Sequence, residues 1–435
     1  MKIIQKVLFG LIIAASVVYC GMFIYKTFFY VNGKLYVALF DDSMISMTYA
    51  RNLARGYGLV WNPGDRVEGF TNPLWVVFMA IFHLFPIPDR LTSLYVEISG
   101  AVFFIASLFF VKKIAERVTP ENFVVPLMAV FMTAFYYPLV QWSLIGTEVS
   151  VLLLICTAAV WLAFRSMDEG KVNPWLYVLM GVGTLVRMDM AVLFLTVWGF
   201  LFLVESKNRW RHLAWGAGTF VAFIGGQTLF RWLYYGELLP ATYYLKMGGV
   251  SLQTRVATGW EAFKAFAKSL KKELLPIPFL LFLFKRDKKV FLLALATGAW
   301  MVYSIYVGGD AWEHRGGSNR FISLGMPFFM VLFSAATWQL INLGKRLIDW
   351  VFKRKMMVIT VLANLGLVLF CCMAMLFANR LKNDGYFMDN LRNLHKGPLR
   401  YAFLYERSIF VPGSLRYAND GLLIREFTTP EARIG

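Results

Sequence analysis

The chain has 435 residues, of which 58% are hydrophobic and 17% aromatic, and its mean hydropathy is +0.58. Only 16% of the residues are charged, well below the roughly 25% of an average soluble domain, which excludes an ordinary soluble protein. Much of the formal net charge of +18 lies in short loops between apolar runs, so it indicates membrane topology and argues against nucleic-acid binding.

Apolar runs that approach the ~20 residues of a spanning helix recur along most of the chain. In chain order, we expect spanning helices near 7–31, 91–111, 123–140, 149–164, 174–187, 190–204, 213–235, 273–285, 289–307, 321–342 and 357–378. These segments predict an all-α, polytopic membrane protein with a bundle of about eleven transmembrane helices.

Four clusters of basic residues, within 112–117, 207–211, 285–289 and 345–355, predict the orientation of the helices. Basic loops face the cytoplasm, and all four clusters do so only if the apolar segment 71–86 does not cross the membrane. We therefore expect 71–86 to form a juxtamembrane or re-entrant helix, with the N-terminus inside and residues 32–90 as the first outer loop. Residues 1–378 are then the transmembrane domain, and 379–435 form a short extracytoplasmic tail, either complete or truncated.

Two adjacent carboxylates, Asp41 and Asp42, follow the first apolar run. Charges are costly near hydrocarbon, so a doubled acid at the mouth of a membrane bundle predicts a working site. The alternative is that Asp42 only caps a short helix that ends near Arg55 with Gly56 as its terminator. Arg51 and Arg55 are four residues apart and share one face of that helix, where they can contact a lipid-linked phosphate or lipid headgroups.

Further candidates follow in the outer segments. They are Glu68 and Asn72 in the first outer loop, Glu148 after the third span, Glu237 and Lys246 in the loop 236–272, and Asp310, His314, Arg315 and Arg320 in the glycine-rich loop before the helix 321–342. Two of them have a structural alternative. Glu148 can stabilise a helix N-terminus by its interaction with the helix dipole, and a loop histidine such as His314 is often merely solvated. Arg187 and Asp189 form a pair that is as consistent with a structural ion pair as with catalysis.

The string from Asp41 to Trp75 resembles the first outer loop of bacterial GT-C glycosyltransferases, in particular the mycobacterial terminal arabinofuranosyltransferase type and the pilin arabinosyltransferases. The segments Ile145–Glu148, Tyr235–Pro240 and Gly308–Asp310 with Arg320–Phe321 resemble later motifs of the family in the expected order. The resemblance covers residues 1–330 and fades from residue 380 onward, where many relatives carry a larger extracytoplasmic domain.

The resemblance implies an inverting enzyme of the bacterial inner membrane that moves a sugar, with arabinofuranose expected, from a polyprenyl phosphate to an extracytoplasmic acceptor. The acceptor is a pilin, another surface protein or a cell-envelope glycan, and the active site faces the periplasm. The base of the family maps onto Asp41 or Asp42. One carboxylate would deprotonate the acceptor hydroxyl, and cations would hold the departing phosphate.

The candidates for these cations are Arg51, Arg55, Lys246, Arg315 and Arg320, and the candidates for sugar or acceptor contacts are Glu68, Asn72, Glu148, Glu237, Asp310 and His314. The sequence does not decide whether a metal takes part; no cofactor is certain, and a divalent cation is compatible with the acids. Two alternatives remain, a lipid or solute transporter and a noncatalytic scaffold. Transporters usually contain paired halves, and the sequence has no such internal duplication.

Overall fold

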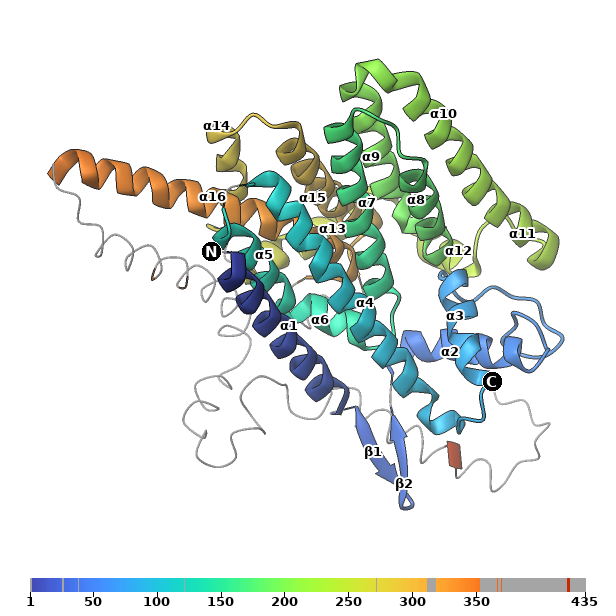
Figure 1. Ribbon diagram of the computed structural model, residues 1–435. Coiled ribbons are helices and arrows are strands. Elements are labelled where there is room, and N and C mark those ends of the chain that lie inside the picture. The colour runs from blue at the N-terminus through green and yellow to red at the C-terminus, as the bar shows by residue number, and fades with distance from the viewer. Residues whose placement is uncertain are drawn as a thin grey trace.

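The computed structural model describes residues 2–352 except 26, 38, 121, 271 and 311–317, together with a few isolated positions further on. The expected helix 357–378 and the tail 379–435 lie outside this continuous part. Figure 1 shows a helical bundle with one small hairpin at its lower end.

The helices of the first half are α1 (Lys2–Tyr25), α2 (Asp41–Ala54), α3 (Pro73–His83), α4 (Asp89–Val118), α5 (Val124–Ala134), α6 (Tyr137–Leu144), α7 (Val149–Glu169), α8 (Pro174–Val186), η1 (Met188–Met190) and α9 (Ala191–Val204). Those of the second half are η2 (Ser206–Asn208), α10 (Arg209–Phe220), η3 (Val221–Gly225), α11 (Gly226–Tyr235), α12 (Ala241–Met247), α13 (Leu252–Ser269), η4 (Ile277–Leu280), α14 (Leu281–Phe284), α15 (Lys288–Val307) and α16 (Arg320–Phe352). The strands β1 (Phe28–Val31) and β2 (Lys34–Val37) pair antiparallel.

Within the described residues, six helices are long and apolar enough to cross a membrane, or seven if the bent pair α5 and α6 counts as one span. Three shorter apolar helices, Pro73–His83, Pro174–Val186 and Met188–Val204, accompany them. The chain is therefore a polytopic, all-α membrane protein, as predicted. The count of about eleven spans stays a prediction.

Ion pairs join the ends of several helices at one end of the bundle. Asp168 of α7 binds both Arg117 of α4, at 2.6 Å, and Lys289 of α15, at 2.5 Å. Lys288 lies 3.5 Å from Glu205, which follows α9. Three of the basic clusters or their neighbours thus meet at one face, which agrees with the predicted cytoplasmic side.

The first outer segment lies toward the other end of the bundle. Its helix α2 ends at Ala54, and Gly56 follows with φ +83°, a conformation that favours glycine and terminates helices. Helix α3 has only 11 residues, about 16 Å at 1.5 Å per residue, and it packs mainly against α2. Its length agrees with a juxtamembrane or re-entrant helix, because a full crossing needs roughly 30 Å.

One expectation differs from the structure. Residues 252–269 were expected in an outer loop, but they form α13, which packs along α15 beginning at the C-terminal end of α15. A Cβ atom at Gly259 would lie 2.2 Å from the carbonyl oxygen of Ile305, so glycine permits this close approach. The expected span 273–285 contains only the short helices η4 and α14.

Candidate active site

Asp41 and Asp42 lie in the first turn of α2, and Phe40 occupies the N-cap position without a side-chain cap. The carboxylate of Asp41 accepts a hydrogen bond from the backbone N–H of Asp42, at 3.0 Å, and the Asp41 side chain is exposed. The Asp42 side chain is half-buried and reaches across to Arg320. Because Asp42 is not the N-cap, its place opposite Arg320 is not explained by capping.

Arg320 is the first residue of α16, whose start is fixed by Asn319. The Oδ1 atom of Asn319 accepts the backbone N–H of Ile322 at 3.0 Å, which is the geometry of a helix N-cap. The Nδ2 atom of Asn319 in turn donates to Ser304 of α15 at 2.8 Å. The position of Arg320 is therefore tied to two helices of the bundle.

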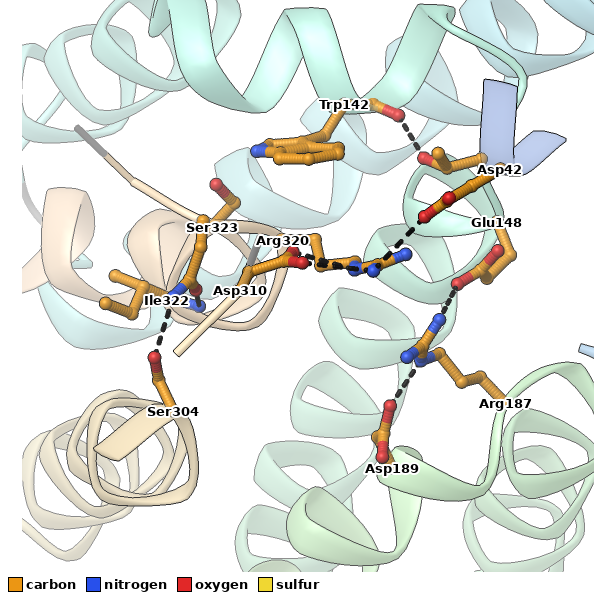
Figure 2. A network of polar contacts seen from close by, with 12 residues as sticks. Asp42, Trp142, Glu148, Arg187, Asp189, Ser304, Asp310, Arg320, Ile322 and Ser323 are labelled. Atoms are coloured by element: carbon orange, nitrogen blue, oxygen red, sulfur yellow. Dashed lines mark hydrogen bonds and ion pairs between the residues drawn. The ribbon is translucent and has the colours of Figure 1, made fainter. Parts of the chain in front are cut away.

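Arg320 binds two carboxylates from different parts of the chain. Its Nε and Nη2 atoms donate to the Oδ2 and Oδ1 atoms of Asp310, at 2.8 and 3.1 Å, and Nη2 lies 3.6 Å from Oδ2 of Asp42. Figure 2 shows the guanidinium group of Arg320 between these two acids. The Asp310 pair has the two-point geometry that makes arginine–carboxylate pairs strong and directional.

Aromatic rings flank the guanidinium group of Arg320. The ring of Trp142, from α6, lies 5.8 Å from it, and that of Phe321 lies 5.9 Å away. The Nε1 atom of Trp142 donates to the backbone oxygen of Ser318 at 3.0 Å, which holds α6 against the start of α16. These contacts restrict the rotamers of Arg320 and limit its access to water.

A second polar network lies beside the first and is centred on Arg187, which follows α8. Arg187 donates to Oε1 of Glu148 at 2.6 Å and to the carboxylate of Asp189, which also accepts the hydroxyl of Tyr303. Figure 2 shows Arg187 pointing between Glu148 and Asp189. Arg187 and Asp189 thus form an ion pair, which was the structural alternative to a catalytic role. Glu148 is a second carboxylate partner of Arg187.

Glu148 connects this network to the first outer segment. Its Oε2 atom accepts a hydrogen bond from Asn72 at 2.8 Å, and the Oδ1 atom of Asn72 accepts one from Ser46 of α2 at 3.0 Å. Burial raises the pKa of Glu148, but the charges of Arg187 and Arg320 outweigh it and hold the pKa below its ordinary value. Glu148 is therefore an ionised, buried carboxylate outside the helix α7.

The structure does not bring Arg51 and Arg55 together with Asp42. Both lie near the C-terminal end of α2, and Arg55 follows Asp42 by 13 positions, roughly 20 Å along a helix at 1.5 Å per residue. Arg55 binds Asp89 at 3.0 Å in an exposed ion pair. Burial, and then the nearby charge of Arg55, lower the pKa of Arg51 from its ordinary value. A phosphate role for these two arginines stays a prediction and requires a phosphate at that end of α2.

The remaining candidates lie away from these two networks or outside the residues that the structure describes. Glu68 is buried and paired with Arg231 of α11, while Glu237 is exposed in the loop before α12. His314 and Arg315 lie outside the described residues, as does the side chain of Lys246, although its backbone belongs to α12. Among the residues that the structure describes, no group of three or more acids, histidines or cysteines could hold a metal ion.

The sequence did not point to two members of these networks, Ser46 and Tyr303. A serine in an amphipathic helix and a tyrosine near the end of an apolar helix are ordinary at a membrane interface, so neither carried a signal.

Comparison with solved structures gives the fold of the chain. It is similar to ArnT from Cupriavidus metallidurans bound to undecaprenyl phosphate, with a TM-score of 0.50 and 11% identity over 90% of this chain and 73% of that one. The Archaeoglobus fulgidus oligosaccharyltransferase in its apo form gives a TM-score of 0.51 and 11% identity over 93% of this chain and 59% of that one. The chain has the GT-C fold. The predicted fold class is confirmed.

A sequence match covers part of this GT-C fold. Residues 76–227, roughly a third of the chain, match the family model described as dolichyl-phosphate-mannose-protein mannosyltransferase. The same archaeal oligosaccharyltransferase, tethered to an acceptor peptide that contains the NVT sequon, gives a TM-score of 0.50 and 12% identity over 91% of this chain and 59% of that one. No curated protein sequence matches the chain. The chain thus spans less than two thirds of the length of the oligosaccharyltransferase.

Proposed function

We propose that the protein is an inverting glycosyltransferase that moves a sugar from a polyprenyl-phosphate donor to the hydroxyl group of an extracytoplasmic acceptor. The observation that carries the proposal is the half-buried carboxylate of Asp42 beside the guanidinium group of Arg320, at the end of the bundle that is predicted to face outward. The match of residues 76–227 to a mannosyltransferase family and the bound undecaprenyl phosphate of ArnT support the same donor class.

The proposed chemistry needs few groups. A polyprenyl phosphate is already a leaving group, so the enzyme has to remove a proton from the acceptor and stabilise the phosphate that departs. Asp42 accepts the proton of the acceptor hydroxyl, whose oxygen forms a bond to the anomeric carbon. The bond from that carbon to the phosphate oxygen breaks, and the phosphate keeps the electron pair. Asp41 is the weaker candidate for the base, because its carboxylate is exposed and bound to its own neighbour.

Arg320 is the described residue that suits the phosphate best. Asp310 fixes its orientation, so a phosphate oxygen can take the place of the Asp42 carboxylate beside Nη2 with little loss of side-chain entropy. In this scheme the donor phosphate displaces Asp42 from Arg320 and frees the carboxylate to act as the base. Arg315 and Lys246, from the neighbouring outer segments, are proposed as further phosphate contacts.

The finer assignments belong to the same proposal. The sugar is arabinofuranose, and the acceptor is a pilin, another surface protein or an envelope glycan. The site faces the periplasm from the bacterial inner membrane. These assignments rest on the resemblance of the string Asp41–Trp75 to bacterial arabinofuranosyltransferases.

A transfer assay tests the function. Purified protein would be incubated with radiolabelled polyprenyl-phosphate arabinofuranose or polyprenyl-phosphate mannose and a panel of protein and glycan acceptors. We expect transfer from one donor with inversion at the anomeric carbon. Movement of the intact lipid between the leaflets of proteoliposomes, with no transfer to any acceptor, would instead support the transporter alternative.

A further inference from the structure

Helix α11 carries two polar side chains toward the interior of the protein. Gln227 and Arg231 are four residues apart, so they share one face of the helix, and they are 6% and 1% exposed. Leu229, Trp232 and Leu233 are more than half exposed on the other faces, as expected for a helix that contacts lipid. In Figure 1, α11 lies at one edge of the bundle beside the segment that joins α2 to α3.

These two side chains have hydrogen-bonding atoms that the described protein does not satisfy. Neither Oε1 nor Nε2 of Gln227 has a partner among the described residues, and the same holds for Nη1 of Arg231. Buried polar groups are hydrogen-bonded in the large majority of cases, so three such atoms on one helix face call for a polar partner that the described protein does not supply. The five residues directly before α11 form the π-helix η3, a geometry that is frequent at functional sites.

The polar face of α11 lies close to the candidate active site. The Nε atom of Arg231 donates to both carboxylate oxygens of Glu68, at 3.0 and 2.8 Å. Glu68 is four residues from Asn72, which binds Glu148, and four residues of chain span at most about 14 Å. The polar face of α11 is therefore linked to the network of Glu148 through the short segment from Glu68 to Asn72.

The charges at this face favour a neutral ligand. The ion pair of Glu68 with Arg231 has no net charge, and its carboxylate would repel a phosphate. The amide of Gln227 offers one donor and one acceptor group, and a hydroxyl group can use both because it donates and accepts. We propose that Gln227 and Arg231 form a subsite for the hydroxyl groups of the donor sugar. This inference rests on the proposed function and adds the residues that recognise the sugar.

Equilibrium binding of two radiolabelled lipids to purified protein tests the subsite. The probes are polyprenyl-phosphate arabinofuranose and polyprenyl phosphate without a sugar. In the Gln227→Met variant, which keeps the length of the side chain but removes both polar atoms, we expect about tenfold weaker binding of the sugar-bearing lipid. Binding of the sugarless lipid should be unchanged, and the melting temperature should be equal or higher, because Gln227 has no internal partner to lose.

Thr219 provides a matched control on the same long span. It is also buried, but its hydroxyl donates to the backbone oxygen of Trp215 at 2.6 Å, so Thr219→Val should leave the affinity for both lipids unchanged. Equal losses for both lipids in Gln227→Met, or no loss for either, would overturn the subsite while leaving the proposed function intact. Wild-type protein that binds neither lipid would refute the proposed function and the subsite with it.

Discussion

The Nη2 atom of Arg320 lies 3.6 Å from the Oδ2 atom of Asp42, and this contact joins the first turn of α2 to the first turn of α16. The same guanidinium group is bound at two points by Asp310. A cation held between two acids, at the end of the bundle that is predicted to face outward, couples the proposed base to the proposed phosphate site. Each of the three side chains can therefore be tested by its own substitution.

The assignment of the base predicts different effects for the two neighbouring aspartates. Asp42→Asn keeps the size of the side chain but removes its basicity, so we expect turnover to fall about 100-fold or more. Asp41→Asn should change turnover only slightly, because the Asp41 carboxylate is exposed and accepts a local backbone hydrogen bond that an asparagine can also accept. Steady-state kinetics of both variants would check this, and equal turnover of Asp42→Asn and wild type would remove Asp42 from the mechanism.

The role of Asp310 as the group that orients Arg320 predicts a loss of donor use. Arg320→Lys keeps the charge but cannot make the two-point contact with Asp310, so kcat/KM for the donor should fall at an unchanged net charge. Asp310→Asn should have a similar effect, and the two changes combined should cost less than the sum of their separate effects. Purely additive losses would show that Asp310 and Arg320 act independently.

Arg51 and Arg55 of α2, which the sequence predicted to bind the donor phosphate, provide a comparison with Arg320. Arg320→Gln should raise the donor KM, and Arg55→Gln should leave it nearly unchanged, because Arg55 is roughly 20 Å from Asp42 along α2 and its exposed ion pair with Asp89 is worth little. The acceptor KM serves as the internal control in each variant. A larger rise of donor KM in Arg55→Gln than in Arg320→Gln would show that the donor phosphate binds at the C-terminal end of α2 and not at Arg320.

The sequence could predict several residues of the candidate site but not how they pair. Asp42 was a candidate because charges are costly near a membrane, and Glu148, Asp310 and Arg320 were candidates in segments that resemble later family motifs. The four residues converge in the structure. Their pairing could not be predicted, since it depends on how α2, α7 and α16 pack and not on local spacing. Arg51 and Arg55 show the limit of helical spacing: it predicts that they are neighbours but not that α2 carries them away from Asp42.

The fold shows a similar limit at α13. The charged residues Arg255, Glu261, Lys264 and Lys268 lower the hydropathy of this segment, so the apolar pattern predicted a loop. In the structure α13 buries Gly259, Ala262 and Phe266 on the face toward α15 and leaves Glu261 and Lys264 outside. Hydropathy averaged over a window cannot detect a helix whose burial depends on one stripe of small and apolar residues.

The topology makes a prediction that does not depend on the chemistry. Single cysteines introduced at positions 64 and 316 should react with a membrane-impermeant maleimide added from the outside, and cysteines at 113 and 287 should not. Positions 113 and 287 lie beside the ion pairs that join the ends of α4, α7 and α15 that are predicted to face the cytoplasm. Labelling of position 113 from the outside would mean that α3 crosses the membrane.

The buried pair of Glu148 with Arg187 predicts how stability depends on pH. The pKa of Glu148 is held below its ordinary value, about 4.3, despite burial, by Arg187 and Arg320. A carboxylate with a depressed folded-state pKa contributes stability above its unfolded pKa and loses it as the pH falls through the folded value. The melting temperature of wild-type protein in detergent should therefore fall as the pH is lowered from about 5 toward 3.

The Glu148→Gln variant should be less stable than wild type at pH 7, and its melting temperature should fall less steeply as the pH is lowered. Glu237→Gln, an exposed control, should follow wild type, and an unchanged slope in Glu148→Gln would contradict the assignment.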